Sequence, residues 1–292
     1  MAKAARQLSV SNPVVSKAVS DLERALEARL LDRGAQGVEP TIYGRALLDH
    51  ALTVFDELSQ AVKHVEFLAD PTAGEVRIGS SIALASGLIT TVIDRLSREY
   101  PRLVFHLLAA ETGMTYRAFE ERKVDLAIAH IFESIANEQM DAEVLYDDQE
   151  VIVAGAHNPW TRRRKIELAE LMHEPWTLPP PDTLTGSVIT RAFRDRGLDL
   201  PSTTIITPSV PVRTAQLATG RFLTIIPESV LRFSPNNPAL KRLPVELPTT
   251  RRPVGVITLK NRTLSPVAHL FIDRAREVAR PLAISAKRLR AG

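Results

Sequence analysis

A short stretch near the N-terminus carries hydrogen-bonding side chains at spacings that suit the reading of nucleic acid. Ser11 precedes a predicted helix that has Pro13 near its start, and the first turns carry Asn12, Ser16 and Lys17. A helix placed in the major groove of DNA brings the side chains of its first turns to the base edges. Asn pairs with adenine there, and Lys contacts guanine or phosphate. These residues are candidates for binding DNA, although each of them alone would be an ordinary cap, packed side chain or surface group.

A second set of polar residues follows the predicted strands of the later part of the chain. In open α/β sheets a ligand binds beyond the carboxyl ends of the strands, where helix N-termini offer unpaired N–H groups. Hydroxyls at such positions suit a small organic anion or a polar metabolite. The same residue types are also ordinary helix caps, so a purely structural role is the alternative for each. The candidates for this ligand site are Ser80, Ser81, Ala83, Thr112, His130, Ser187 and Ser209.

No group of residues in the sequence predicts catalysis. The chain has no cysteine, which excludes disulfides, thiolate nucleophiles and Cys-ligated metal sites. The sequence GSSI lacks the closing glycine of a nucleophile elbow, and neither a Walker loop nor a glycine-rich dinucleotide fingerprint is present. The seven histidines are scattered, without a pair at metal-binding spacing. We therefore expect no enzyme, no metal site and no cofactor.

The elements that must position the first set of residues have the spacing of a helix-turn-helix. Val15, Val19, Leu22 and Leu26 recur at intervals of three and four, which is typical of an amphipathic helix. A short apolar stripe within residues 4–8 precedes it, and only a few residues join the two. After this helix, the sequence DRGAQGVEP contains two glycines and a proline, which predicts a tight hairpin or wing.

Thr41 begins a long amphipathic helix. Because nothing local covers its apolar stripe, we predict that two copies of the chain pair along it, rather than that it packs on its own domain. The sequence ADPTAG, residues 69–74, ends this helix as a linker. The stripe consists of Leu47, Leu48, Ala51, Leu52, Phe55, Leu58, Val62, Val65 and Leu68.

From Glu75 onward, short apolar runs alternate with amphipathic helices, which predicts parallel strands with crossover helices. One set runs from VRIGSS to VDLAIAH and a second from EVIVAGA to FLTIIP. The late strand RRPVGVITLK and the helix after it have no later unit to pack on, so we expect them to rejoin the first set. The expected domains are 1–45 for DNA binding, 41–70 for the linker helix and 74–280 for ligand binding. In the last domain, lobe I takes 74–150 and 252–280, and lobe II takes 151–251.

Composition agrees with a globular protein of the cell interior. Hydrophobic residues make up 45% of the 292 and charged residues 24%, which are ordinary values for folded domains. The longest uncharged stretch, residues 78–93, is short and interrupted by glycine and serine, so it does not predict a membrane span. The N-terminus lacks the apolar run of a secretory signal. We expect a cytoplasmic protein, and the net charge of +3 decides little about its partners.

Residues 8–33, LSVSNPVVSKAVSDLERALEARLLDR, closely resemble the recognition region of LysR-type transcriptional regulators. In that family a Ser-x-Pro-x-x-Ser element opens the reading helix and a Leu-Glu pair lies inside it. The similarity continues through Pro40, Thr41 and Gly44 and extends to about Arg280. It implies an α+β multi-domain protein with a winged helix-turn-helix, a long linker helix and a two-lobed α/β domain like that of periplasmic binding proteins. The matching residues are Ser11, Pro13, Ser16, Leu22, Glu23, Leu26, Leu30 and Arg33.

The resemblance also implies the function of a DNA-binding transcriptional regulator. Such a protein is a homodimer or homotetramer whose binding to double-stranded operator DNA responds to a small-molecule effector between the lobes. Its DNA-binding residues would be Ser11, Asn12, Pro13, Ser16, Lys17 and Arg33, with Arg33 on a phosphate near the wing. One alternative is a solute-binding receptor of the periplasmic type, which would need an export signal and no DNA-reading element. A second is a regulator that has lost DNA binding.

The sequence departs from the family pattern at its start and at two positions. Family members have about one further helix before the position of Ala4, so we expect the first helix of the DNA-binding domain to be missing from this chain. That helix packs across the reading helix in the family. Glu27 stands where a glycine is usual, and Leu31 replaces a usual Phe, a change that a packed core tolerates.

Overall fold

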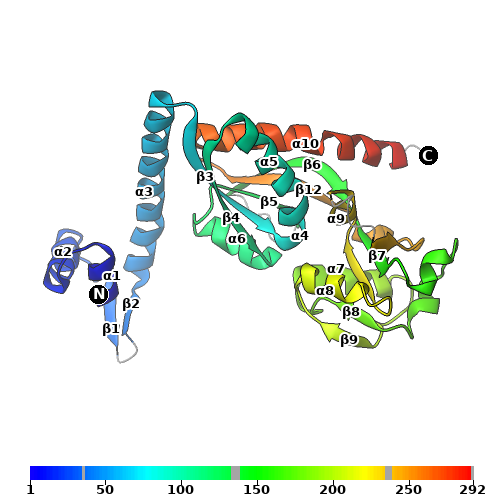
Figure 1. The fold of residues 1–292 in the computed structure, drawn as a ribbon. Helices are drawn as coiled ribbons and strands as arrows, with labels where there is room; N and C mark the ends of the chain where they lie inside the picture. The colour runs from blue at the N-terminus through cyan, green and yellow to red at the C-terminus, as the bar shows by residue number, and fades with distance from the viewer. Residues whose placement is uncertain (35–36, 133–138, 234–238, 291–292) are drawn as a thin grey trace. The chain divides into compact units, whose positions relative to one another are not determined.

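The computed structural model describes residues 1–34, 37–132, 139–233 and 239–290. The chain forms two compact units, Met1–Gln60 and Ala61–Gly292. Figure 1 labels their helices and strands along the chain.

The first unit contains the predicted helix-turn-helix and hairpin. Helices α1 (Ala2–Gln7) and α2 (Asn12–Ala25) are separated by a short turn, in which Ser9 has a φ of 54°. Strands β1 (Leu31–Gly34) and β2 (Gly37–Pro40) pair antiparallel, which confirms the predicted hairpin. None of the residues of α2 is buried in the chain as described.

The backbone just after α2 has a conformation that favours glycine, the residue usual in LysR-type regulators at the position of Glu27. Glu27 has a φ of 50°, in the left-handed region that favours glycine. Its N–H donates to the Arg24 carbonyl, which helps to close the last turn of the helix. Glu23 fixes the following chain, because its Oε1 accepts hydrogen bonds from the backbone N–H groups of Leu30 and Leu31, at 2.8 and 3.2 Å. The turn is therefore kept without the glycine, at a cost in backbone strain.

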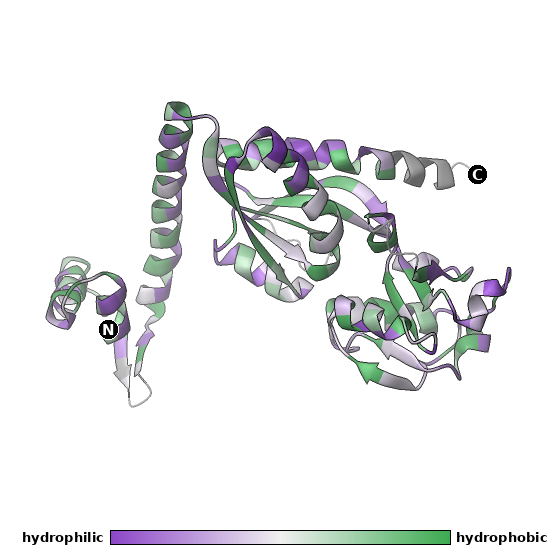
Figure 2. Cartoon of the chain, in the orientation of Figure 1, coloured by the Kyte–Doolittle hydropathy of each residue, from purple (hydrophilic) through white to green (hydrophobic). Residues whose placement is uncertain are grey.

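Helix α3 (Ile42–Ala69) is continuous over 28 residues, as predicted for the linker helix. Thr41 caps its start, accepting a hydrogen bond from Gly44 N–H at 3.0 Å. Apolar residues recur along its whole length (Figure 2). Among the described helices, none is both long and apolar enough to cross a membrane.

The second unit contains two five-stranded sheets. The first has the order β4-β3-β5-β12-β6. Its strands are β3 (Ala73–Ser81), β4 (Arg102–Ala110), β5 (Leu126–His130), β6 (Met140–Asp148) and β12 (Arg252–Leu259). Its helical segments are α4 (Ile82–Leu84), the π-helix η1 (Ala85–Ile89), α5 (Thr90–Glu99), α6 (Thr112–Glu120) and α10 (Pro266–Arg290). One face is a core around Ile78, Leu88 and Phe271, and a second cluster around Phe119 lies under α6.

The second sheet has the order β11-β7-β10-β8-β9. Its strands are β7 (Glu150–Gly155), β8 (Trp176–Leu178), β9 (Thr203–Ile206), β10 (Leu223–Pro227) and β11 (Leu240–Arg242). Its helical segments are η2 (Pro159–Arg162), η3 (Leu168–Leu171), α7 (Leu184–Arg194), α8 (Val210–Leu217), α9 (Glu228–Phe233) and η4 (Pro248–Thr250). The core is anchored by Trp176 and Phe193, whose rings meet edge to face at 6.0 Å.

The expectation that the late strand rejoins the first set is confirmed, since β12 lies between β5 and β6. The expected parallel strands are confirmed for β4-β3-β5 and for β10-β8-β9. They are not found for β12, which runs antiparallel to β5 and β6, or for β7, which runs antiparallel to β10 and β11. Both strands enter their sheet directly from the other one. A crossover helix is what brings a chain back to run parallel, and neither strand is preceded by one.

Candidate functional site

The start of α2 carries the residues predicted to bind DNA. Ser11 is its N-cap residue, and its hydroxyl accepts no hydrogen bond from the described backbone of the helix. Pro13 lies in the first turn. Asn12, Pro13 and Lys17 are exposed, whereas Ser16 is half-buried. The structure thus gathers Ser11, Asn12, Pro13 and Lys17 as exposed groups at one end of one helix, where a duplex is able to reach them.

Arg33 lies away from this helix in the chain, within β1 of the hairpin. Its side chain is outside the part that the structure describes, as is the hairpin turn at residues 35–36. The antiparallel register joins Arg33 with Val38. The role of Arg33 on a phosphate therefore stays a prediction.

Helix α3 exposes the apolar stripe that the sequence predicted to pair with a second copy. Leu58, Val65 and Leu68 are more than half exposed. Large apolar side chains in such a contiguous row are typical of an interaction surface rather than of a solvated helix face. Other exposed members of the stripe are Leu48, Leu52, Phe55 and Val62.

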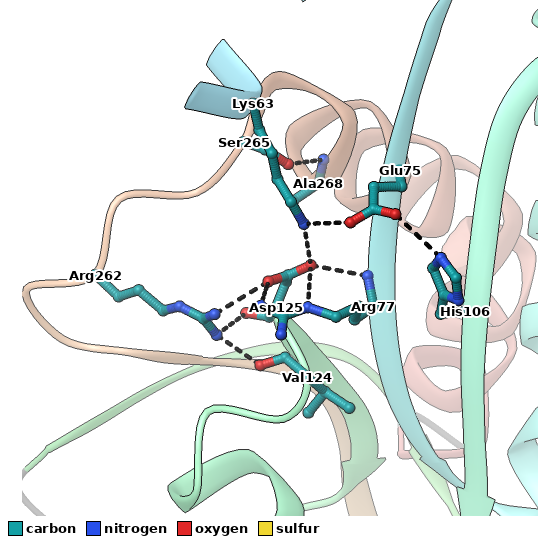
Figure 3. A network of polar contacts seen from close by, with 9 residues as sticks. All are labelled: Lys63, Glu75, Arg77, His106, Val124, Asp125, Arg262, Ser265 and Ala268. Atoms are coloured by element: carbon teal, nitrogen blue, oxygen red, sulfur yellow. Dashed lines mark hydrogen bonds and ion pairs between the residues drawn. The ribbon is translucent and has the colours of Figure 1, made fainter. Parts of the chain in front are cut away.

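The last part of α3 carries one side of an ionic cluster centred on Asp125, a fully buried residue just before β5 (Figure 3). Lys63 Nζ lies 3.1 Å from Glu75 Oε1 and 3.6 Å from Asp125 Oδ2. Arg77 donates to Asp125 through its backbone N–H at 2.8 Å and through Nη2 at 2.6 Å. Arg262, also fully buried on its side chain, donates from Nη2 to Asp125 Oδ1 at 3.0 Å.

This cluster brings three cations to one buried carboxylate. Burial raises the pKa of Asp125, but hydrogen bonds from Arg77 and the charges of Lys63 and Arg77 outweigh it, so the pKa lies below its ordinary value. Glu75 also faces His106, whose Nε2 lies 3.2 Å from Glu75 Oε2 (Figure 3). The cluster thus connects the end of α3, through Lys63, to β3, to the residue before β5 and to the segment after β12.

A pocket lies beyond the carboxyl ends of strands from both sheets. Its cavity volume is about 50 Å³, within a wider hollow of about 510 Å³ that includes open solvent. Three helix starts surround it, those of α4, α6 and α7, together with the first turn of α8. Its lining residues are Ser81, Ile82, Ala83, Ala110, Glu111, Thr112, His130, Glu150, Pro179, Thr183, Thr185, Pro208, Val210, Arg213 and Pro227.

Two charged residues that line the pocket are almost fully buried. Glu150 is 3% exposed and Arg213 is 2% exposed. Glu150 Oε1 lies 3.2 Å from Arg252 Nη2, and Arg213 Nη1 donates to the Ile225 carbonyl at 2.7 Å. Burial raises the pKa of Glu150, offset in part by the charge of Arg252, and burial lowers the pKa of Arg213 to about 10. Buried charged groups are costly to keep, and groups with shifted pKa values are typical of functional sites.

Asp148 links the two lobes next to this pocket. It ends β6 of the first sheet, and its Oδ2 accepts a hydrogen bond at 2.6 Å from the hydroxyl of Ser229 in α9. His130 Nε2, at the end of β5, lies 3.5 Å from the same oxygen. Burial raises the pKa of Asp148, but the contacts with His130 and Ser229 outweigh it and the pKa is lowered. His130 also lines the pocket, so the pocket wall includes a side chain that contacts the junction of the lobes.

Four of the seven residues predicted for the ligand site line this pocket. They are Ser81, Ala83, Thr112 and His130. The Ser81 side chain also accepts a hydrogen bond from Leu84 N–H at 3.4 Å, as the N-cap of α4. These residues lie at or just after the ends of β3, β4 and β5, up to 49 positions apart in the sequence. The strands are neighbours in the order β4-β3-β5 and run parallel, so their ends lie at the same edge of the sheet.

The other three residues do not line the pocket. Ser80 is fully buried inside the sheet, where its hydroxyl donates to the Ile128 carbonyl at 2.9 Å. Ser187 is exposed in α7 and donates to the Leu184 carbonyl at 2.8 Å. Ser209 is the N-cap of α8, and its hydroxyl accepts from Val212 N–H at 3.4 Å. Each hydroxyl is used within its own lobe.

Sequence reasoning did not assign Glu150, Glu111 or Thr183 to the site. Glu150 begins the otherwise apolar run EVIVAG, and a charge at the start of a fully buried strand was the available signal. Arg213 is a further lining residue, and its burial depends on the packing of α8 against β10, which no local pattern reveals.

Comparison with known protein families gives two matches that together cover most of the chain. The LysR substrate binding domain matches residues 69–280. The bacterial regulatory helix-turn-helix protein of the lysR family matches residues 1–45.

Curated relatives match over almost the whole chain. The HTH-type transcriptional regulator GbpR of Azospirillum brasilense is 29% identical over 281 residues, which cover 94% of this chain and 80% of that protein. The transcriptional dual regulator GltC of Bacillus subtilis is 25% identical over 260 residues, covering 89% and 85%.

Solved structures share the fold. A full-length OxyR from Pseudomonas aeruginosa aligns with a TM-score of 0.70 at 19% identity, covering 96% of this chain and 91% of that one. A full-length CbnR complexed with its target DNA aligns with a TM-score of 0.57 at 18% identity, covering 95% and 93%. The effector-binding domain of QuiR in complex with shikimate aligns with a TM-score of 0.57 at 17% identity, covering 72% and 98%.

Proposed function

The chain belongs to the LysR family of bacterial transcription regulators, and we propose that it reads operator DNA through the start of α2 under the control of an effector in the pocket between its two sheets. The observation that carries this proposal is the exposed polar end of α2, formed by Ser11, Asn12, Pro13 and Lys17, inside the segment that matches the lysR helix-turn-helix. Recognition helices present their first turns to base edges in this way. The function needs binding alone, without a catalytic step.

The relatives support both halves of the proposal. CbnR was solved with its target DNA, and the effector-binding domain of QuiR was solved with shikimate. In this chain the corresponding fold has a pocket lined by the hydroxyl-bearing residues Ser81, Thr112, Thr183 and Thr185. A concave site with a few convergent polar groups is typical of small-molecule binding.

We also propose that two or four copies assemble through α3. Its exposed apolar stripe is the surface for pairing, since covering Leu58, Val65 and Leu68 removes a large apolar area from water. The lysine of the Asp125 cluster then connects the paired helix to the lobe of the first sheet. A ligand changes DNA binding in such an assembly only through its different affinities for two arrangements of the lobes.

A solute-binding receptor is the second candidate, because it would share the two-sheet unit and its pocket. It offers no role for the first unit, whose helix-turn-helix matches a DNA-binding family over residues 1–45. A regulator that has lost DNA binding would keep every feature except the interaction of α2 with operator DNA. The same DNA-binding experiment separates all three candidates.

Replacement of Lys17 with alanine tests the role of α2. We expect Lys17→Ala to weaken operator binding by about 1–3 kcal/mol, because Lys17 then no longer contacts a base or phosphate. The measurement is a mobility shift at fixed salt on the DNA upstream of the gene. The matched control is Lys165→Ala, which removes an equally charged and exposed side chain from the second unit. Equal affinities of Lys17→Ala and the unaltered protein would exclude Lys17 from the interface.

A further inference from the structure

The charges around the pocket do not favour an anionic ligand. The charged lining residues are Glu111, Glu150 and Arg213, two carboxylates and one guanidinium, and the lining also includes His130, which contacts Asp148. The second guanidinium nearby, that of Arg252, is paired with Glu150 and lies over the Phe132 ring, 4.8 Å from its centroid. A ligand that brings a net negative charge into this partly buried space gains no excess positive charge to compensate its lost hydration.

One of the helix starts around the pocket, that of α6, is already capped by a carboxylate. Glu111 is the N-cap of α6, and its side chain accepts a hydrogen bond at 3.0 Å from the N–H of Gly113. Free N–H groups and the positive end of the helix dipole are what attract anions to such a position. In this chain the protein's own carboxylate takes that place.

Two residues that line the pocket each have a buried polar atom without a hydrogen-bond partner among the described residues. These atoms are Glu150 Oε2, an acceptor, and Arg213 Nε, a donor. Burying such atoms without a hydrogen bond destabilises a protein, so their retention indicates a partner that arrives from outside. A ligand that satisfies both atoms would donate a hydrogen bond to Glu150 Oε2 and accept one from Arg213 Nε.

We propose that the effector is an electrically neutral small molecule that donates a hydrogen bond to Glu150 from a hydroxyl or ammonium group, and offers an oxygen to Arg213. Two classes of compound have this combination of donor and acceptor without net charge. One is the polyols and sugars, and the other is the zwitterionic amino acids. The proposal rests on the effector role of this pocket. It replaces the organic anion that the sequence had suggested as one candidate with a ligand matched to the charges of the wall.

Thermal shifts of the full-length protein test the proposal with three sets of probes at millimolar concentration. The sets are aldoses and polyols, zwitterionic amino acids with uncharged side chains, and carboxylates including shikimate. We expect a member of one of the first two sets to raise the melting temperature, and the responding set identifies the source of the donor group. Stabilisation by carboxylates alone, or by none of the probes, would overturn the proposal.

Glu150→Gln then tests the contact itself. This variant keeps the shape of the side chain and removes its charge, so the affinity for the stabilising neutral probe should fall roughly 10- to 100-fold. Glu246→Gln is the matched control, because Glu246 is exposed on the same lobe and does not line the pocket. Equal affinities of Glu150→Gln and the unaltered protein would show that Glu150 does not receive the ligand.

A second variant keeps the proposal testable if Glu150→Gln does not fold. Glu111→Gln retains an oxygen for the cap of α6 and removes one of the two carboxylates of the wall. We expect it to bind carboxylates more tightly than the unaltered protein does, and an unchanged carboxylate affinity would contradict the electrostatic argument. Operator binding without any probe reports separately on the proposed function. A protein that binds operator and responds only to carboxylates would retain that function and refute the neutral effector.

Discussion

Asp125→Asn is expected to lower the free energy of unfolding by about 3–5 kcal/mol, because it leaves the buried cations of its cluster without their central charge. Arg262 has a fully buried side chain, and Arg77 contacts Asp125 through both its backbone and its guanidinium. Removing one member of a buried ionic group costs more than the group itself contributes, since the remaining charges stay desolvated. Chemical denaturation of the full chain measures the change.

The matched control for this substitution is Asp94→Asn. Asp94 pairs with Arg98 one helical turn away at 3.0 Å, and both side chains are more than half exposed. Exposed pairs at this spacing contribute about 0.3–0.5 kcal/mol. If the two variants lost the same small amount of stability, the Asp125 cluster would have no structural importance.

The same carboxylate sets an acid limit on stability. The pKa of Asp125 is lowered in the folded chain, so its stabilising contribution is complete above the ordinary value of 3.8 and is lost as the pH falls through the folded-state pKa. We therefore expect the stability difference between the unaltered protein and Asp125→Asn to shrink on acidification below that value. A difference that stays constant from neutral pH to pH 3 would contradict the assignment.

Gly186→Ala is expected to disrupt the wall of the ligand pocket. A Cβ at this position would lie 1.9 Å from the Pro180 carbonyl oxygen and 2.9 Å from the Pro181 Cα, both of which belong to the backbone. Thr183 accepts from Gly186 N–H at 3.0 Å and donates to Pro180 at 2.8 Å, so the start of α7 must shift as a unit. Overpacking of this kind typically costs about 1–3 kcal/mol.

The functional consequence follows from the position of Thr183 and Thr185 in the pocket. Their displacement should lower the affinity for the effector by roughly tenfold or more. Operator binding in the absence of effector should be retained. Ser187→Ala is the control, since Ser187 is exposed one position further along α7 and does not line the pocket. Isothermal titration of both variants with the identified effector measures the effect. Normal effector affinity in Gly186→Ala, or an equal loss in Ser187→Ala, would refute this role of the loop.

Elements with strong periodicity were predictable from the sequence. Helix α2 and the linker helix α3 follow from apolar residues at intervals of three and four, and the hairpin follows from its glycines. Strand β6 was missed because its sequence, MDAEVLYDD, has a polar, exposed stretch and resembles a loop. The return of β12 to the first sheet was predicted, but the antiparallel direction of β7 and β12 was not, because strand direction depends on pairing partners that are distant in the sequence.

The pocket at the strand ends contains four of the seven residues predicted for a ligand site, and the role of these residues stays a prediction. Ser80 and Ser81 are neighbours on a strand, so they point to opposite sides, and only the folded sheet shows which one reaches the pocket. Ser187 and Ser209 were predicted because they lie near helix starts. A position one residue away along the chain decides whether such a side chain lines the pocket or faces solvent. Glu150 is separated from Arg252 by 102 positions, so the pairing that holds it could not be read from either segment.

The most direct test of the proposed function compares the affinity of the full-length protein for the duplex upstream of its gene with that for a scrambled duplex of equal length. Fluorescence anisotropy at one physiological salt concentration gives both values. We predict that the upstream duplex binds at least about a thousandfold more tightly, as specific readers of DNA do. Equal affinity for the two duplexes would contradict a regulator that recognises its operator through α2.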